Sequence, residues 1–270
     1  MKLTEKIKQT ALVTGAASGL GFELAMLLAQ DGYDLFLVDV DIQGLEKAKK
    51  EIETQFSSEV KLIAKDLSTC NVAPEIFEAI EDVPIDVLIN NAGFGIFGSF
   101  QDTDWKREAE MLNLHVVTTT HLTKLVLKGM VARGKGKILN LSSLAAFQPG
   151  PLMSLYYASK AYILSFSEAI ANELKGSGVT VTVLCPGQTK TCFQDVVSNG
   201  IGKSSSENKI SFNIACPKAV AKYGYEAMQK GKIVAIPGNI NKLLSKLPRF
   251  VSRRTATAVI RRIQEKNRAH

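Results

Sequence analysis

The sequence lacks the features that mark membrane-spanning and disulfide-bonded proteins. It contains no apolar run of 18 residues, so we expect no membrane-spanning helix. The first residues, MKLTEKIKQTALVTGA, include no apolar core of a signal peptide before the first predicted strand. Four cysteines, at positions 70, 185, 192 and 216, are widely spaced and form no C-x-x-C pair. We therefore expect reduced thiols and a cytoplasmic location.

Residues that commonly bind metal ions are also scarce. The chain contains only three histidines, and His115 and His121 are six positions apart, which places them off a common helix face. With no paired cysteines beside them, this pattern predicts no metal site.

Acidic residues are nearly absent from the C-terminal segment. Between Lys230 and His270 there are eleven Lys or Arg residues and one acidic residue, Glu265, so this segment is the source of the net charge of +7. A basic segment attracts nucleic acid or an anionic membrane surface. A solvated helical face or a subunit contact is the simpler interpretation, and we expect no nucleic-acid partner.

Apolar strands alternate with helices along most of the chain. The predicted strands cover 10–16, 33–41, 59–67, 85–93, 134–143, 179–187 and 232–238, and the predicted helices cover 19–32, 43–55, 74–81, 103–131, 156–176 and a segment that begins at Pro217. Strands that are apolar along their whole length are typical of a sheet covered on both faces. The order predicts an α/β fold with a doubly wound, mostly parallel seven-stranded sheet and helices on both faces.

We expect one domain over residues 1–237, in which the polar segment 188–216 forms a loop or lid over the substrate. Residues 238–270 are predicted to form a basic helical extension in two pieces, interrupted at Pro248. Three alternative roles of this extension are considered. It packs on another subunit or on its own chain, it covers the active site, or it makes weak peripheral contact with a membrane.

A glycine-rich turn follows the first predicted strand. In a parallel sheet of this kind ligands bind beyond the carboxyl ends of the strands. The turn is TGAASGLG, in which Gly15, Gly19 and Gly21 let the backbone turn sharply and approach a pyrophosphate at a helix N-terminus. Its spacing, G-x-x-x-G-x-G, differs from the general G-x-G-x-x-G fingerprint. Its place between a strand and a helix favours nucleotide binding over a structural role.

Acidic residues end the next two predicted strands. Asp39, eighteen residues after Gly21, is placed to accept hydrogen bonds from an adenine ribose diol and would repel a 2′-phosphate. One charge pair at ~4 Å is worth roughly 1–4 kcal/mol, which is about a ten- to thousand-fold preference for NAD over NADP. Helix capping by Asp39 is the weaker alternative because Asp41 can fill that role. Asp66 is predicted either to meet an adenine amino group or to cap a helix.

Five motifs occur in order along the chain: TGAASGLG, NNAG at 90–93, a serine after the fifth strand, YYASK at 156–160, and Pro186-Gly187. Together they resemble the short-chain dehydrogenase/reductase family over roughly residues 8–237. The resemblance implies a Rossmann-like fold, a nicotinamide cofactor and a small carbonyl or alcohol substrate. It also implies a homodimer or homotetramer, assembled through the helices at 103–131 and 156–176.

The resemblance further implies a catalytic set of Asn113, Ser143, Tyr156 and Lys160. Tyr156 would act as general base in alcohol oxidation and as general acid in ketone reduction, with the ammonium of Lys160 favouring tyrosinate. Ser143 would hold the substrate oxygen. Asn113 would position a water that links Lys160 to bulk solvent.

Two positions in this set have a neighbour of the same type, so the register matters. The family spacing Tyr-x-x-x-Lys selects Tyr156 rather than Tyr157, and the distance from the tyrosine selects Ser143 rather than Ser142. Tyr157 then points about 100° away around the helix and packs internally or faces a subunit.

The residues implied for cofactor binding lie at or just beyond the ends of the predicted strands. They are Gly15, Ser18, Gly19, Leu20, Gly21, Asp39, Asp66, Leu67, Asn90, Ala92, Gly93, Tyr156, Lys160, Pro186, Gly187, Thr189 and Thr191. Asn90 is expected near the cofactor ribose, and Thr189 or Thr191 near the nicotinamide carboxamide.

The expectation is an NAD(H)-dependent oxidoreductase that transfers a hydride between nicotinamide and an apolar secondary alcohol or ketone. Two alternatives remain: an NADP(H)-dependent carbonyl reductase of the same family, and a non-catalytic NAD-binding sensor or scaffold.

Overall fold

The computed structural model describes residues 8–81, 83–189 and 215–268. Its centre is a seven-stranded sheet in the order β3-β2-β1-β4-β5-β6-β7, in which every neighbouring pair is parallel. The strands are β1 (Thr10–Thr14), β2 (Asp34–Asp39), β3 (Val60–Ala64), β4 (Val87–Asn90), β5 (Gly136–Leu141), β6 (Val179–Leu184) and β7 (Val234–Ala235). This arrangement confirms the predicted doubly wound α/β sheet.

The strand order reverses between β1 and β4. From β1 the chain moves outward to β2 and β3, returns to β4 on the other side of β1, and continues to β7. In such a sheet a crevice opens at the carboxyl ends of the strands where the order reverses. The loops after β1 and β4 are therefore neighbours, and the Asn91 backbone N–H after β4 donates to the Thr14 hydroxyl at the end of β1, at 3.0 Å.

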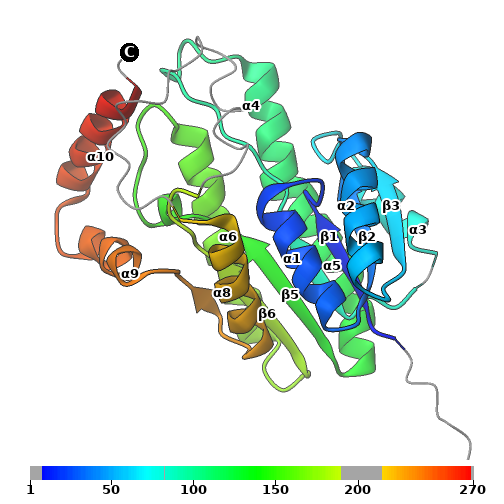
Figure 1. The fold of residues 1–270 in the computed structure, drawn as a ribbon. Helices are drawn as coiled ribbons and strands as arrows, with labels where there is room; N and C mark the ends of the chain where they lie inside the picture. The colour runs from blue at the N-terminus through cyan, green and yellow to red at the C-terminus, as the bar shows by residue number, and fades with distance from the viewer. Residues whose placement is uncertain (1–7, 82, 190–214, 269–270) are drawn as a thin grey trace, which may run out of the picture.

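Helices cover both faces of the sheet (Figure 1). One face carries α1 (Gly19–Gln30), α2 (Ile42–Gln55) and α8 (Pro217–Gln229), and the other carries α3 (Val72–Ala79), α5 (Thr119–Arg133) and α6 (Ser154–Glu173). Within β1, Ala11 and Val13 pack in the first layer and Leu12 in the second. Because successive strand residues face opposite sides, strands buried on both faces must be apolar throughout.

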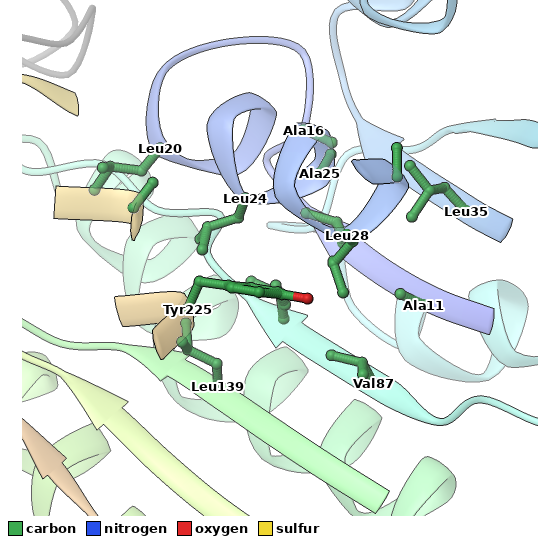
Figure 2. Packing of buried hydrophobic residues seen from close by; sticks show 14 of the residues in the cluster. Ala11, Ala16, Leu20, Leu24, Ala25, Leu28, Leu35, Val87, Leu139 and Tyr225 are labelled. Carbon is green, nitrogen blue, oxygen red and sulfur yellow. The ribbon is translucent and has the colours of Figure 1, made fainter. Parts of the chain in front are cut away.

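Tyr225 of α8 packs in the core against α1 (Figure 2). Its ring lies among Leu24 and Leu28 of α1 and Leu139 of β5. A buried phenol needs a hydrogen-bond partner, and the Tyr225 hydroxyl donates to Asp31 Oδ2 at the end of α1, at 2.5 Å. This bond connects α8 to the C-terminal end of α1.

The helix predicted over 103–131 is not continuous. It consists of α4 (Trp105–Leu112), a π-helical turn over Asn113–Thr118, and α5. The Thr118 hydroxyl donates to the Leu67 carbonyl oxygen at 2.9 Å, which ties the turn to the segment after β3. The Thr119 hydroxyl donates to the Leu114 carbonyl oxygen, five positions back, at 3.1 Å. These contacts accompany the wider π-helical turn. The apolar periodicity of the sequence does not indicate such a turn. π-Helical turns are frequent at functional sites.

The C-terminal segment forms α9 (Asn239–Lys246), a 3-10 turn over Leu247–Arg249 that contains Pro248, and α10 (Arg253–Arg268). Gln264 Nε2 of α10 donates to the Tyr157 hydroxyl of α6 at 2.9 Å. Ala256 of α10 is buried. The extension therefore packs on its own chain. Among the described residues no helix is both long and apolar enough to cross a bilayer.

The central strands should dominate stability. Leu88 of β4 is fully buried, so Leu88→Ala should lower the free energy of unfolding by about 2–5 kcal/mol through the lost contacts and the cavity left behind. Leu243 of α9 is 60% exposed. Leu243→Ala should therefore change the free energy of unfolding by about 0.5 kcal/mol or less. Urea unfolding of both variants measures the difference. Equal losses would contradict the exposed position of Leu243.

Candidate active site

The turn after β1 requires glycine at two positions. Gly15 has a φ of +66°, and a Cβ built there would lie 2.7 Å from Asn91 Nδ2. A Cβ at Gly21 would lie 2.0 Å from the Gly15 carbonyl oxygen. A side chain at either position would collide with the protein's own atoms, so the turn packs closely against Asn91 and against its own backbone.

Asn91 holds the turn in place and was given no individual role in the sequence prediction. Its Nδ2 donates to the Thr14 and Gly15 carbonyl oxygens, both at 3.0 Å. The only sequence signal for it is membership of the NNAG motif. Asn90, for which a place near the ribose was predicted, is buried and donates to Thr123 Oγ1 and Asn140 Oδ1, both at 2.9 Å. Its role beside a cofactor stays a prediction.

The first turn of α1 is open to an anion. Ser18 is the N-cap residue and makes no side-chain bond to the helix, Gly19 has a φ of +59°, and Leu20 is buried beneath them. The first N–H groups of a helix have no partner within the helix, and they favour phosphate groups.

Asp39 ends β2 beside the glycine turn. Its carboxylate accepts from the Ala17 backbone N–H at 3.0 Å and from the Asp41 backbone N–H at 3.1 Å. The N-cap of α2 is Asp41, whose side chain accepts from the Gly44 N–H at 3.0 Å. Capping therefore does not account for Asp39, and its charge lies at the edge of the crevice.

Asp66 and Leu67 follow β3. Asp66 Oδ1 accepts from the Ser68 backbone N–H at 2.9 Å and from its hydroxyl at 2.7 Å, which orders the turn before α3. The N-cap of α3 is Asn71, so Asp66 is not a helix cap. Leu67 is buried. Contact of Asp66 with an adenine amino group stays a prediction.

The remaining predicted cofactor residues lie at the ends of β4 and β6. Ala92 N–H after β4 donates to the Thr14 hydroxyl at 3.2 Å. The Pro186 carbonyl oxygen accepts from the Leu144 N–H at 2.9 Å, and the Thr189 hydroxyl donates to the Gly187 carbonyl oxygen at 3.2 Å. Thr191 and most of the predicted lid 188–216 lie outside the described residues.

Lys160 is a buried lysine at the centre of the site. It is 3% exposed, and its Nζ donates to the Leu141 carbonyl oxygen at 3.0 Å and lies 5.7 Å from the centre of the Tyr156 ring. The buried Ser142 hydroxyl donates to the Lys160 carbonyl oxygen at 2.8 Å, whereas Ser143 hydrogen-bonds with Tyr156. The structure thus brings Ser143, Tyr156 and Lys160 together, in the predicted register.

Burial has the largest effect on the pKa values of Tyr156 and Lys160. Desolvation raises the pKa of Tyr156 well above its usual range, and the hydrogen bond with Ser143 offsets part of that increase. Desolvation also lowers the pKa of Lys160 to about 8. The sequence argument expected the lysine charge to favour tyrosinate, but in this structure burial is the larger effect. At neutral pH the phenol is protonated and the lysine is charged.

The Asn113 side chain faces the segment between β3 and α3, and its role in positioning a water for Lys160 stays a prediction. Its Nδ2 donates to the Ser68 and Thr69 carbonyl oxygens, at 2.7 and 2.8 Å, on the segment between β3 and α3. Two positions later His115 lies on the Lys160 side, because residues two apart on a helix point in nearly opposite directions. The sequence prediction considered His115 only as a metal ligand.

A cavity of about 630 Å³ lies between the segment after β5, the start of α6 and the C-terminal extension. Its lining includes Phe147, Pro149, Pro151 and Tyr157, with Arg249 and Arg253 from the extension. Tyr157 packs against Tyr156, with 6.1 Å between ring centres. Tyr157 thus packs against Tyr156 and the C-terminal extension within its own chain, and whether it also faces a subunit stays a prediction.

These residues fit a nicotinamide dinucleotide. The glycine turn and the N-terminus of α1 suit a pyrophosphate, the Asp39 carboxylate lies at the end of β2 beside that turn, and the Tyr156–Lys160 pair lies at the end of β5. Within residues 8–81, 83–189 and 215–268, no group of three His, Cys, Asp or Glu side chains is arranged to hold a metal ion. The fold and site define a dinucleotide-binding oxidoreductase.

Comparison with known proteins gives the family. A model of the short chain dehydrogenase family matches residues 9–202. Mus musculus 17-beta-hydroxysteroid dehydrogenase type 3 is 33% identical over 201 residues, which span 74% of this chain and 66% of that protein. Rattus norvegicus very-long-chain 3-oxoacyl-CoA reductase is 30% identical over 252 residues, 91% of this chain and 78% of that one. The chain belongs to the short-chain dehydrogenase family.

Solved structures agree with this assignment. A short-chain dehydrogenase from Sphingobium yanoikuyae in complex with NADPH superposes with a TM-score of 0.77 at 26% identity, and the match covers 90% of this chain and 96% of that one.

The buried ammonium of Lys160 should reduce stability at neutral pH. Its pKa is lowered from 10.5 to about 8, so the unfolded chain binds more protons between these values and the free energy of unfolding should rise from pH 8 to 10.5. Lys160→Met should therefore stabilise the protein by about 1–3 kcal/mol at pH 7, and less at each higher pH. Urea unfolding from pH 7 to 10 tests this, with the exposed Lys124→Met as the control. A difference that does not change with pH would contradict it.

Proposed function

We propose that this protein is a nicotinamide-dependent reductase that converts an apolar ketone to a secondary alcohol. The observation that supports this proposal is the Tyr156 phenol, held with Ser143 beside the buried ammonium of Lys160 at the carboxyl end of β5. A protonated phenol in this setting is suited to donate a proton. That is the requirement of the reductive direction.

Each of the three side chains has a separate task in this proposal. A bound nicotinamide supplies the hydride to the carbonyl carbon. The Ser143 hydroxyl holds the substrate oxygen, and the Tyr156 phenol donates its proton to that oxygen as negative charge develops. The Lys160 ammonium stabilises the tyrosinate that remains and favours its reprotonation.

For the cofactor we propose NAD(H), with NADP(H) as the alternative. Among the described residues the Asp39 carboxylate accepts from two backbone N–H groups, which leaves further lone pairs for a ribose diol. The next residue, Val40, is 69% exposed and has no cation to offer a 2′-phosphate. The Sphingobium relative was solved with NADPH, which makes direct comparison of the two cofactors necessary.

For the substrate we propose a large apolar ketone. The cavity of about 630 Å³ beside Tyr157 is within the usual range for a small-molecule site, and much of its lining is apolar, but Ser143, Tyr156 and Lys160 are not part of that lining. The names of the mouse and rat relatives refer to a hydroxysteroid and a very-long-chain 3-oxoacyl thioester, both large and apolar. A steroid-like ring system and a long acyl chain are the two classes to compare.

The proposal also includes a cellular location and an oligomeric state. Cys70, Cys185 and Cys216 are free thiols, which supports a cytoplasmic setting.

The C-terminal extension leaves an apolar face exposed, with Leu243, Leu247 and Phe250, the last 83% exposed. A second copy, giving a homodimer or homotetramer, and an anionic membrane surface both suit this basic, apolar face. Light scattering with and without anionic vesicles distinguishes them.

Replacing the proposed proton donor should abolish most turnover. Tyr156→Phe should lower kcat for ketone reduction by about 10²–10⁴-fold because it removes the acidic proton. Tyr157→Phe removes the hydroxyl that accepts from Gln264 and should change stability by about 0.5–1.5 kcal/mol, with a much smaller loss of kcat than Tyr156→Phe. Oxidation of NADH and NADPH over steroid and 3-oxoacyl ketones measures both. Tight cofactor binding without turnover on any ketone would favour the non-catalytic sensor or scaffold.

The charge of Asp39 should set cofactor preference. Asp39→Asn keeps an acceptor for the backbone but removes the charge, so the preference for NADH over NADPH should fall by about ten- to thousand-fold. Asp41→Asn keeps a good N-cap and should leave the preference nearly unchanged. The ratio of kcat/KM for the two cofactors measures the effect. A wild-type preference for NADPH would refute the role of Asp39.

A further inference from the structure

The cavity of about 630 Å³ between α6 and the C-terminal extension contains two charges to which the proposed function gives no task. Much of its lining is apolar, with Phe147, Pro149, Pro151 and Ala158 on one side and Pro248 and Ala256 of the extension on the other. The lining also includes two cations, Arg249 and Arg253, and no acidic residue among the described ones. The cavity is therefore apolar with a positive charge on the side of the extension.

Arg249 and Arg253 form no ion pair within the described part of the chain. The only acidic residue between Lys230 and His270 is Glu265, and its carboxylate accepts from Arg261 Nε at 2.7 Å. Both cavity arginines are exposed, so an anion from solution reaches them without first breaking an ion pair. Their charges add to a positive potential at the cavity, which favours the binding of an anion.

The backbone that carries these arginines is held against α6. Arg249 ends the 3-10 turn, and Arg253 begins α10. Ala256, in the first turn of α10, is buried, and Gln264 Nε2 further along the helix donates to the Tyr157 hydroxyl at 2.9 Å. Because α10 is fixed at both points, little backbone freedom has to be lost when a ligand binds beside it.

An arginine pair beside an apolar cavity matches one class of ligand. Guanidinium groups bind phosphate and carboxylate oxygens through two parallel hydrogen bonds. Apolar walls accommodate an acyl chain or a ring system. A neutral ketone would contact the walls and leave both charges unpaired, and an organic cation would be repelled. The combination fits an amphipathic anion, in which an apolar chain carries a phosphate or a carboxylate.

The cavity adjoins the proposed proton donor. Tyr157 is part of its lining, and the centre of the Tyr157 ring is 6.1 Å from that of Tyr156. Ser154, in the first turn of α6, also lines the cavity, two positions before Tyr156. A ligand held in this cavity therefore lies beside the turn of α6 that carries Tyr156.

We propose that Arg249 and Arg253 determine the choice of substrate, because they bind the phosphate or carboxylate of an amphipathic ketone whose apolar part lies against the cavity walls. The proposal deepens the proposed function and rests on it, since a choice between substrates requires turnover. Of the two classes compared above, it favours the 3-oxoacyl thioester of a phosphate-bearing carrier over an uncharged steroid.

Removing both charges should weaken the use of anionic ketones alone. The double variant Arg249→Gln/Arg253→Gln should raise KM for a 3-oxoacyl-CoA about tenfold and leave kcat nearly unchanged, because the lost hydrogen bonds act on binding rather than on the chemical step. KM for the uncharged 3-oxoacyl ethyl ester of the same chain length should stay nearly the same. The double variant Arg249→Lys/Arg253→Lys keeps the charges and should recover part of the loss.

The matched control removes two charges from α10 outside the cavity. Arg254 and Arg262 are exposed and do not line it. Arg254→Gln/Arg262→Gln should therefore leave KM for both ketones nearly unchanged. An equal rise of KM in this control would overturn the proposal, because it would show general attraction to the basic extension rather than binding in the cavity.

A second measurement does not depend on turnover. In calorimetric titrations of the full chain, octyl phosphate should bind about tenfold more tightly than 1-octanol, and the difference should be lost in Arg249→Gln/Arg253→Gln. Octyl phosphate should also inhibit reduction of the 3-oxoacyl-CoA competitively. Binding without competition would refute the role in substrate choice, because the cavity would then hold a separate anionic lipid.

Two further results would overturn the proposal: equal affinities of the wild type for octyl phosphate and 1-octanol, and an unchanged affinity for octyl phosphate in the folded double glutamine variant. If circular dichroism shows that this variant does not fold, Arg253→Gln alone takes its place in the same comparison. Absence of turnover by the wild type on any ketone would instead refute the proposed function. The octyl phosphate titration alone would then decide whether Arg249 and Arg253 bind an anion.

Discussion

The site depends on one buried positive charge. The ammonium of Lys160 is held by the Leu141 carbonyl oxygen at the end of β5, lies near the face of the Tyr156 ring, and shares the space before Gly93 with His115. Burying a charge is unfavourable unless it is hydrogen-bonded. The surrounding acceptors are therefore a structural requirement as well as a chemical one, and the lowered pKa of Lys160 shows that they do not fully offset its burial.

The parallel sheet makes this arrangement possible because it collects distant segments at one edge. The turn after β1, the acidic end of β2, and the ends of β4 and β5 are far apart in the chain, yet their carboxyl ends are neighbours. Contacts such as that between Asn91 and Gly15 join these loops to one another. The candidate groups come from loops, such as the glycine turn, and from the ends of rigid elements, such as Asp39 of β2 and Tyr156 and Lys160 of α6.

The sequence does not predict the pKa values in the site or the contacts of individual side chains on the helix that contains Asn113 and His115. The expected effect of the lysine charge on Tyr156 is outweighed by desolvation, which can only be judged once the burial of the phenol is known. The Asn113 side chain hydrogen-bonds with the segment after β3, whereas His115, two positions later, lies near Lys160. The π-helical turn that contains both residues is stabilised by contacts with the segment after β3, far away in the sequence.

The sequence by itself determined the sheet and the family, because each depends on local spacing and on apolar runs. It also predicted a break at Pro248, where a 3-10 turn separates α9 from α10. Only the tertiary structure decided which side chains meet from different elements: the buried state of Lys160, the contact of Asn113 with the segment after β3, and the unpartnered nitrogen of His115. These depend on three-dimensional packing, for which spacing along the chain contains no direct signal.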